Sequence, residues 1–411
     1  MKVITRLLAT SAVAVAGTAL AQVPLTDSSV MSIHDDILTL DTHIDIGAGY
    51  GTPALDPAVL NRAQVNLPSM RAGGLDAGFF IVYTPQGELN DEGHAAAVEA
   101  AEEKYRGILR MLRANTGTIG LAKTSDEVET LNEKGMLAAL IGIENSSPLG
   151  NTPEEVRQSV AMWAERGARY ASITHFGHNQ FGGSSNPSLQ RGDGEDPGLS
   201  ELGRVLIEAL NDHGIMVDIS HVGPTTAADA MALSRAPIIA SHSTVYAVYA
   251  NARGLSDEQL AAIRDDGGVA HITAFRSYLA AVDPKISAAI DELREELGLV
   301  TGADRRAASP EQLTHYTREV ARIRQEFEDV TLEQFLDHVD HAVEVAGIDH
   351  VGLSGDFDGG GGVEGWDGAA DSPNVTAALL QRGYSRDDLA KMWGGNLLRV
   401  LRDVQAQAEN S

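Results

Sequence analysis

The sequence contains no cysteine among its 411 residues. This absence excludes a disulfide framework, thiolate metal ligands, a thiol nucleophile and a lipid-modified cysteine. Any metal ion in this protein must therefore be held by histidine and carboxylate side chains.

Positive charge is also scarce. Lysine and arginine together number 31 against 58 aspartate and glutamate residues, which gives a formal net charge of −27 at pH 7. A charge of this sign and size argues against nucleic acid and against anionic membrane surfaces as partners. It accounts for good solubility and does not identify a substrate.

Long apolar runs are missing beyond the N-terminus. Residues 1–21 begin with Lys2 and Arg6, continue with an apolar stretch and end in Ala19-Leu20-Ala21. This order is typical of a secretory signal peptide cleaved near Ala21, and the short stretch with its Ser, Thr and Gly residues disfavours a transmembrane anchor. We therefore expect residues 22–411 to be secreted without a membrane span, and to reach the periplasm in a host with two membranes.

Eight short apolar segments are typical of buried parallel strands because they are nearly continuous rather than alternating. They are residues 37–46, 77–84, 136–145, 168–175, 215–221, 236–243, 268–275 and 350–358. Most are separated by helix-like segments, at residues 92–114, 124–134, 152–166, 200–213, 225–234 and 256–265. This alternation predicts an α/β protein with a single (β/α)8 TIM barrel domain over residues 22–411.

A charged, helical segment at about 276–330 interrupts the alternation of strands and helices. It lies between the seventh predicted strand and a helix over 332–346. We expect a helical insertion there. Its composition favours a solvated helical hairpin, although it could also act as a lid or an oligomer contact. The glycine-rich stretch 359–366 follows the eighth strand and is expected to form a turn that could border the site.

Six of the eight predicted strands end in histidine or a carboxylate, and barrels of this kind carry their chemistry at these ends. The candidate metal ligands are His43, Asp45, Glu144, His221 and His242. Five such ligands exceed what one tetrahedral catalytic site uses, so they favour a centre of two metal ions with a bridging hydroxide. Glu144 is the natural bridge because a carboxylate offers two oxygens.

The remaining polar residues at the strand ends have several possible roles. Asp356 can serve as the general base and then the general acid, or it could orient other residues or bind metal, and Asp358 competes for the acid/base role. His175 could stabilise an oxyanion, or it could form a loop hydrogen bond with Asn179 or Asn186. Arg253 could pair with a substrate carboxylate or could be an ordinary surface arginine.

Taken together, these segments resemble the membrane (renal) dipeptidase family, the zinc dipeptidases of peptidase family M19. The matching motifs are Asp41-Thr42-His43-Ile44-Asp45, Gly142-Ile143-Glu144-Asn145, Ile173-Thr174-His175, Asp218-Ile219-Ser220-His221, Ser241-His242-Ser243, Arg253 and the segment from Gly352 to Gly359. Their order is kept over essentially the whole chain after the expected signal peptide.

The resemblance implies two Zn²⁺ ions per chain in a barrel of the metal-dependent hydrolase type. His43 and Asp45 would hold one ion, His221 and His242 the other, and Glu144 would bridge them. His175 and Arg253 would bind a dipeptide substrate, and Asp356 would be the acid/base that also contacts it. The family hydrolyses dipeptides, often with a D-residue at the C-terminal position, and some members open β-lactams. A homodimer is compatible with the resemblance, but without cysteine no disulfide can link two copies.

Two rival functions follow from the same residues. Another binuclear amidohydrolase, such as a deacetylase, lactonase or β-lactam hydrolase, would often use a carbamylated lysine, and no lysine lies at any of the eight strand ends. A catalytically inactive metal-binding barrel is disfavoured because every expected site residue is present.

Overall fold

The computed structural model describes residues 28–47 and 49–410. The signal peptide expected at residues 1–21 lies outside these residues. No helix within the described residues combines the length and the apolar character needed to cross a membrane.

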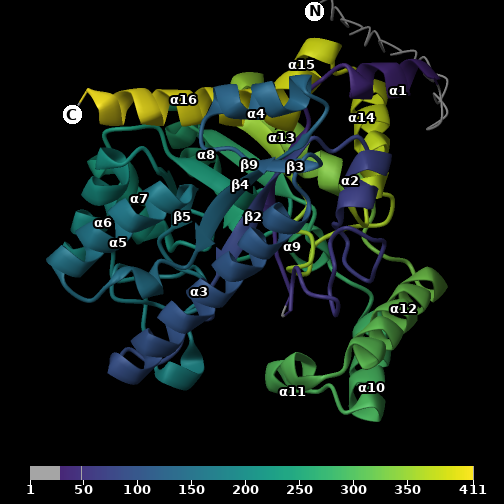
Figure 1. The fold of residues 1–411 in the computed structure, drawn as a ribbon, viewed down its shortest axis with the longest axis horizontal. Coiled ribbons are helices and arrows are strands. Elements are labelled where there is room, and N and C mark those ends of the chain that lie inside the picture. The colour runs from purple at the N-terminus through teal and green to yellow at the C-terminus, as the bar shows by residue number, and fades with distance from the viewer. Residues whose placement is uncertain (1–27, 48, 411) are drawn as a thin grey trace, which may run out of the picture.

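Eight parallel strands form a nearly closed barrel at the centre of the protein (Figure 1). In order around the barrel they are β1 (Leu40–Ile44), β2 (Ala77–Tyr83), β4 (Leu137–Glu144), β5 (Ala168–Ser172), β6 (Met216–Asp218), β7 (Ile239–Val245), β9 (Val269–Thr273) and β10 (Val351–Ser354). Each corresponds to one predicted strand, so the TIM barrel prediction is confirmed. Two short strands were not predicted, β3 (Ile119–Leu121) beside β4 and β8 (Gly254–Leu255) beside β7, because two or three residues carry no recognisable pattern.

The barrel closes where β10 meets β1. Ile44 and Phe357 form an isolated parallel bridge, and the Asp45 N–H donates to the Phe357 carbonyl at 2.9 Å. The Gly355 N–H also donates to Asp41 Oδ2 at 2.9 Å. This closure brings the residues after the last strand beside those at the end of the first.

The amino end of the barrel is filled with apolar side chains. Leu40, Phe79, Leu140 and Tyr170 belong to one buried cluster inside the barrel, and Leu401 of the C-terminal helix belongs to the same cluster. This helix, α16 (Asn396–Glu409), runs across that end of the sheet (Figure 1). Polar groups are therefore accommodated at the opposite, carboxyl end.

Helices surround the barrel and follow the predicted alternation. They include α3 (Asp91–Ala114), α4 (Ser125–Glu133), α5 (Pro153–Arg166), α6 (Glu201–Asp212), α7 (Pro224–Leu233), α8 (Asp257–Asp265) and α13 (Leu332–Ala346). Local signals fix the ends of α5: Thr152 and Glu155 form a capping box, and Gly167 adopts φ 107° just after the last turn. Four more helices lie near the two ends of the chain, namely α1 (Ser28–Asp35), α2 (Leu67–Ala72), α14 (Ser372–Gln381) and α15 (Arg386–Ala390), and a π-helical turn over Lys391–Gly395 joins α15 to α16.

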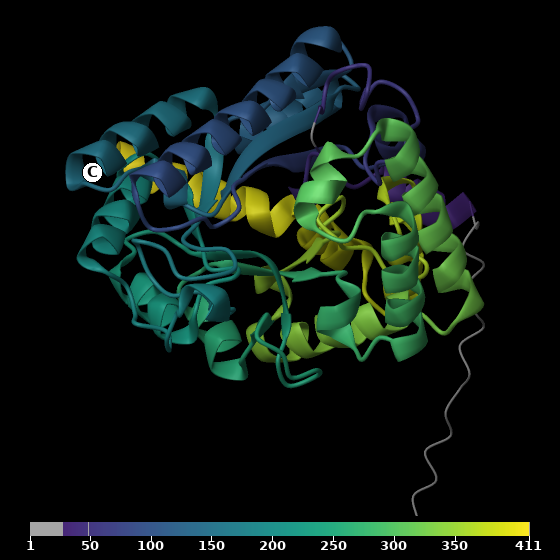
Figure 2. The same cartoon turned by 90° about the horizontal axis from the view of Figure 1, so that it is seen from below.

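The predicted insertion is helical and comprises α9 (Arg276–Leu279), α10 (Pro284–Leu297), α11 (Gly302–Ala307) and α12 (Pro310–Glu326). Helices α10 and α12 pack through a small apolar cluster of their own, centred on Ile286, Ile290 and Ile323. They project from the barrel in Figure 1 and lie over one side of it in Figure 2.

Arg276 attaches this insertion to the barrel. Its Nε donates to Asp329 Oδ2 at 2.6 Å, and its Nη2 donates to Asp367 Oδ1 at 2.7 Å. Arg276 begins the insertion, Asp329 ends it, and Asp367 belongs to the loop after the last strand. The Glu364 N–H of that loop donates to the Val330 carbonyl at 2.8 Å. Both ends of the insertion are therefore fixed to the loop that follows β10.

Candidate metal centre and substrate site

The candidate residues lie in the carboxyl-terminal parts of the barrel strands or in the loops that follow them. His43 is in β1 with Asp45 immediately after it, Glu144 ends β4, His175 and His221 follow β5 and β6, His242 is in β7, Arg253 precedes β8, and Asp356 follows β10. Residues more than 300 positions apart in the chain thus meet at one end of the barrel.

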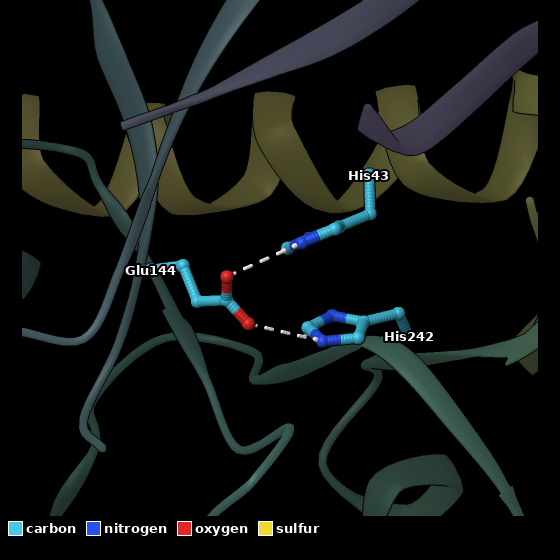
Figure 3. A group of neighbouring side chains, drawn as sticks. All are labelled: His43, Glu144 and His242. Carbon is cyan, nitrogen blue, oxygen red and sulfur yellow. Dashed lines mark ion pairs between the residues drawn. The ribbon is translucent and has the colours of Figure 1, made fainter. Parts of the chain in front are cut away.

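Glu144 lies between two groups of histidines. Its Oε1 is 3.1 Å from His221 Nε2 and 3.3 Å from His242 Nε2, and its Oε2 is 3.5 Å from His43 Nε2. Figure 3 shows the two oxygens directed to different rings, one to His43 and one to His242. A carboxylate in this arrangement can contribute one oxygen to each of two neighbouring ions.

The other carboxylates of the site gather on the His43 side. His43 Nε2 is 3.7 Å from Asp45 Oδ2, as expected for side chains at i and i+2 near a strand end. Ligand atoms of His43, Asp45 and Asp356 all lie within 4.8 Å of one another. Asp356 is therefore next to the proposed metal ligands.

The distances between the candidate ligand atoms are compatible with bound metal ions. Zinc–ligand distances of about 2.0–2.1 Å place tetrahedral ligands roughly 3.3 Å apart, and the Nε2 atoms of His221 and His242 with Glu144 Oε1 are separated by 2.9 to 3.3 Å. Ligand atoms of His43, Glu144 and His242 form one group of potential ligands, and those of Glu144, His175 and His221 form another.

The pKa shifts of three candidate ligands, Glu144, His221 and His242, favour metal binding, whereas the carboxylates around His43, chiefly Glu144, outweigh burial and raise its pKa to about 9. Burial would raise the pKa of Glu144, but the surrounding imidazoles hold it well below its usual range, so the carboxylate is ionised. Burial together with neighbouring positive charge holds the pKa of His221 and His242 well below the ordinary value, so both rings are neutral. Ionised carboxylates and neutral imidazoles are the forms that bind metal. Burial raises the pKa of Asp356 to about 8.

Tyr170 orients the ring of His43. The tyrosine hydroxyl donates to the Thr42 carbonyl at 3.0 Å, and His43 Nδ1 lies 2.9 Å from the same hydroxyl oxygen. Because the hydroxyl proton is used, Nδ1 must carry the proton of this second hydrogen bond. In the neutral ring, the form that binds metal, the lone pair of His43 is then on Nε2, which faces Glu144 and Asp45.

His242 is oriented in the same way by a serine and an aspartate. Ser241 Oγ donates to Asp218 Oδ2 at 2.6 Å and lies 2.7 Å from His242 Nδ1. His242 therefore donates from Nδ1, and its Nε2 lone pair faces Glu144 Oε1. Asp218 also accepts the backbone N–H groups of Ser220 and Ser241, at 3.0 and 2.8 Å, which fixes the loop that carries His221 to the strand that carries His242.

The backbone is strained around the site. Among the described non-glycine residues, those with positive φ are Asn145 (73°), His221 (67°), Asp356 (49°) and Asp358 (63°). All four follow strands at the carboxyl end of the barrel. Such conformations persist where surrounding contacts enforce them, and they commonly mark functional sites.

His175 and Arg253 lie on the Oε1 side of Glu144. His175 Nε2 is 3.8 Å from Glu144 Oε1, and its ring centroid is 4.3 Å from that of His221. Arg253 is buried rather than on the surface, and its Nη2 donates to the His242 carbonyl at 2.6 Å. Its buried Nε has no hydrogen-bond partner within the described residues. This guanidinium can therefore still donate to a substrate carboxylate.

The two aspartates after β10 differ in their surroundings. The carboxylate of Asp358 accepts the backbone N–H groups of Gln64 and Val65, at 3.0 and 3.2 Å, so it anchors a loop. Asp356 instead faces His43 and Asp45. Gly359 packs against this pair: a Cβ placed on it would lie 2.3 Å from Asp356 Oδ1 and 2.4 Å from Asp45 Oδ2. The glycine-rich loop thus borders the site, as the sequence suggested.

The insertion also reaches this region. A cavity of about 170 Å³ beside Asp45 is lined by Arg62, Asp358 and Thr317 of α12. The sequence could not place Thr317 here, because its side chain meets the barrel only through the packing of the helical hairpin.

Sequence reasoning also missed the residues that orient the ligands, namely Tyr170, Asp41, Asp218 and Ser241. Asp41 accepts the His43 N–H at 2.9 Å through Oδ1. Three of the four lie within the quoted motifs, two residues before His43, three before His221 and directly before His242. A buried carboxylate so close to a candidate ligand is a usable signal, whereas Tyr170 has no comparable one because it lies mid-strand.

A parallel barrel with clustered histidines and carboxylates at its carboxyl end has the architecture of metal-dependent hydrolases. The sequence profile of the membrane dipeptidase family, peptidase family M19, matches residues 28–411. The protein belongs to this family and is a dipeptidase, a metal-dependent hydrolase. The family prediction made from the motifs is confirmed.

Individual relatives agree with this assignment. The chain is 29% identical over 350 residues to dipeptidase tcpJ of Claviceps purpurea, covering 83% of this chain and 69% of that protein. It is 29% identical to dipeptidase aclJ of Aspergillus oryzae over 353 residues, with 84% and 71% covered. The crystal structure of the probable dipeptidase PvdM from Pseudomonas aeruginosa superposes with a TM-score of 0.79 at 30% identity, covering 92% of this chain and 98% of that one.

Proposed function

We propose that this dipeptidase uses two zinc ions, held by His43 and Asp45 on one side of Glu144 and by His221 and His242 on the other. The observation that carries the proposal is the division of the Glu144 carboxylate, with Oε2 toward His43 and Oε1 toward His221 and His242. Two ions bound here would polarise the peptide carbonyl and lower the pKa of a water molecule.

Residues of the protein then have separate roles around the scissile bond. Arg253 binds the substrate carboxylate through its unpaired Nε, and His175 donates to the carbonyl oxygen as negative charge develops on it. Asp356 accepts the proton of the attacking water and passes it to the leaving amine. Its position beside His43 and Asp45 supports this role.

We further propose that the substrates include dipeptides with a C-terminal D-residue and that the enzyme works outside the cytoplasm, salvaging dipeptides from cell-wall turnover. The N-terminal pattern through Ala21 supports export. Cell fractionation and N-terminal sequencing of the mature protein test the location, and recovery of an intact N-terminus in the cytoplasm would contradict it.

The mechanism is tested with zinc-loaded protein on matched L,L-, L,D- and N-acetylated dipeptides, beside Asp356→Asn. We expect cleavage of the free dipeptides and a decrease in kcat of about 10²- to 10⁴-fold in the variant with two zinc ions still bound. No cleavage by the zinc-loaded enzyme would exclude the proposal and direct the search to lactones and acylated amines. Unchanged kcat in Asp356→Asn would exclude that residue as the acid/base.

A further inference from the structure

Phe176 is an exposed aromatic residue at a site whose other members are mostly buried. It directly follows His175, and 44% of its surface is accessible. Its ring centroid lies 4.4 Å from that of His175 and 5.1 Å from that of His221. Apolar surface is thus presented to solvent in direct contact with two imidazoles of the site.

Phe176 lies on the Oε1 side of Glu144, and so does Arg253, the residue proposed to bind the substrate carboxylate. His221 and His175 both approach Glu144 Oε1. Arg253 reaches the same side, because its Nη2 donates to the carbonyl of His242 at 2.6 Å and the His242 ring also approaches Glu144 Oε1, at 3.3 Å. A substrate carboxylate held by Arg253 therefore lies on the Phe176 side of the centre.

The covalent structure of a dipeptide then decides which side chain meets Phe176. The free carboxylate belongs to the C-terminal residue, and the side chain of that residue branches from the carbon that carries the carboxylate. The N-terminal residue lies across the scissile bond, toward Glu144 and the His43 side. The C-terminal side chain is the part of the substrate that can cover the exposed ring.

We propose that Phe176 is a specificity-determining residue that forms an apolar wall for the C-terminal side chain of the dipeptide, so that the enzyme favours apolar residues at that position. This inference rests on the proposed function, in particular on the role of Arg253. Its physical basis is that apolar surface removed from water on both partners contributes directly to binding.

The test compares kcat/KM for Ala-Ala, Ala-Leu and Leu-Ala in the zinc-loaded wild type, in Phe176→Ala and in Phe176→Leu. Phe176→Ala should lower kcat/KM for Ala-Leu about tenfold, mainly through KM, while Ala-Ala changes by less than about twofold. Phe176→Leu, which retains an apolar wall, should restore most of the preference. Leu189→Ala, an exposed apolar residue further along the same loop, should leave the preference unchanged.

Other outcomes separate the two proposals. An equal loss for all three dipeptides in Phe176→Ala would overturn the inference, because it would indicate a merely structural role. A larger loss for Leu-Ala than for Ala-Leu would overturn the assignment to the C-terminal position. If the wild type with two zinc ions bound cleaves none of them, the proposed function itself fails and the inference fails with it.

Discussion

Among single residues, Glu144 is the one that would determine how many metal ions the site holds under the proposed function. Each of its oxygens faces a different group of ligands, so an amide in its place would offer one oxygen and one N–H₂ group that repels cations. We expect Glu144→Gln to bind at most one zinc per chain and to lose activity by at least about 100-fold. Metal analysis of the purified variant by mass spectrometry, together with kcat, measures both effects.

Asp358→Asn is the matched control for this substitution. It also converts a buried carboxylate after a strand to an amide, but Asp358 accepts backbone N–H groups of Gln64 and Val65. We expect this variant to retain two zinc ions per chain. Retention of both ions by Glu144→Gln would show that Glu144 is not the bridge.

At the scale of the element, Arg276 holds the helical insertion to the barrel. The guanidinium is buried between Asp329 and Asp367, and removing it leaves the buried carboxylate of Asp329 without its partner. We expect Arg276→Met to lower the free energy of unfolding by about 3 kcal/mol, because breaking a buried ion pair costs more than the pair contributes. Chemical denaturation measures the change.

A surface arginine of the same insertion provides the comparison. Arg318 is largely exposed and forms an ion pair with the next residue, Glu319. Arg318→Met should change the free energy of unfolding by less than about 0.5 kcal/mol. Equal effects of the two substitutions would mean that the Arg276 ion pairs do not stabilise the attachment.

The loop after β5, which carries His175 and Phe176, depends on Asp193. Asp193 Oδ2 accepts the His178 and Ser188 N–H groups, both at 2.8 Å, and a hydrogen bond from Arg191 at 2.9 Å. Burial alone would raise the pKa of Asp193, but these donors lower it below the usual value. Because the pKa is lower in the folded state, the carboxylate stabilises the fold above the unfolded pKa of about 4 and loses this effect as the pH falls through the folded value.

We therefore expect Asp193→Asn to destabilise the protein by about 1–2 kcal/mol at pH 7 and at pH 5, with a smaller difference at pH 3.5. Thermal unfolding of wild type and variant at the three pH values measures this trend. A difference that grows as the pH falls would contradict the assigned direction of the pKa shift.

For the molecule as a whole, the proposed metal binding would be coupled to folding through the strand ends. The candidate ligands come from β1, β4 and β7 and from the residues that follow β1 and β6, so ions bound there would connect strands on opposite sides of the barrel. A ligand that binds only the folded state stabilises it by mass action. Removing the metal with a chelator should lower Tm by roughly 5–10 °C, and added zinc should restore it.

Glu144→Gln serves as the control for the chelation experiment, since it should already lack at least one ion and so show a smaller decrease in Tm. Scanning calorimetry with and without chelator compares the two proteins. An unchanged Tm of the wild type after verified metal removal would mean that the ions do not contribute to stability.

The order of strands and helices could be predicted from the amino-acid sequence, and the sequence also indicated which residue types are candidates for the metal centre. Continuous apolar segments predicted all eight barrel strands, because strands buried on both faces need apolar residues throughout. The polar residues at their ends were recognisable because parallel strands in a barrel bring their carboxyl ends to one place. The absence of cysteine left only histidine and carboxylate as ligands.

Contacts between distant segments could be seen only in the folded protein. The orientation of His43 by Tyr170 and of His242 through Ser241 and Asp218 requires particular atoms to meet across strands. The same holds for the loop contacts of Asp358 and for Thr317 beside the cavity. Residue type and spacing can predict that a group is near the site, but the direction of its hydrogen bonds is set by packing and becomes known only in the folded chain.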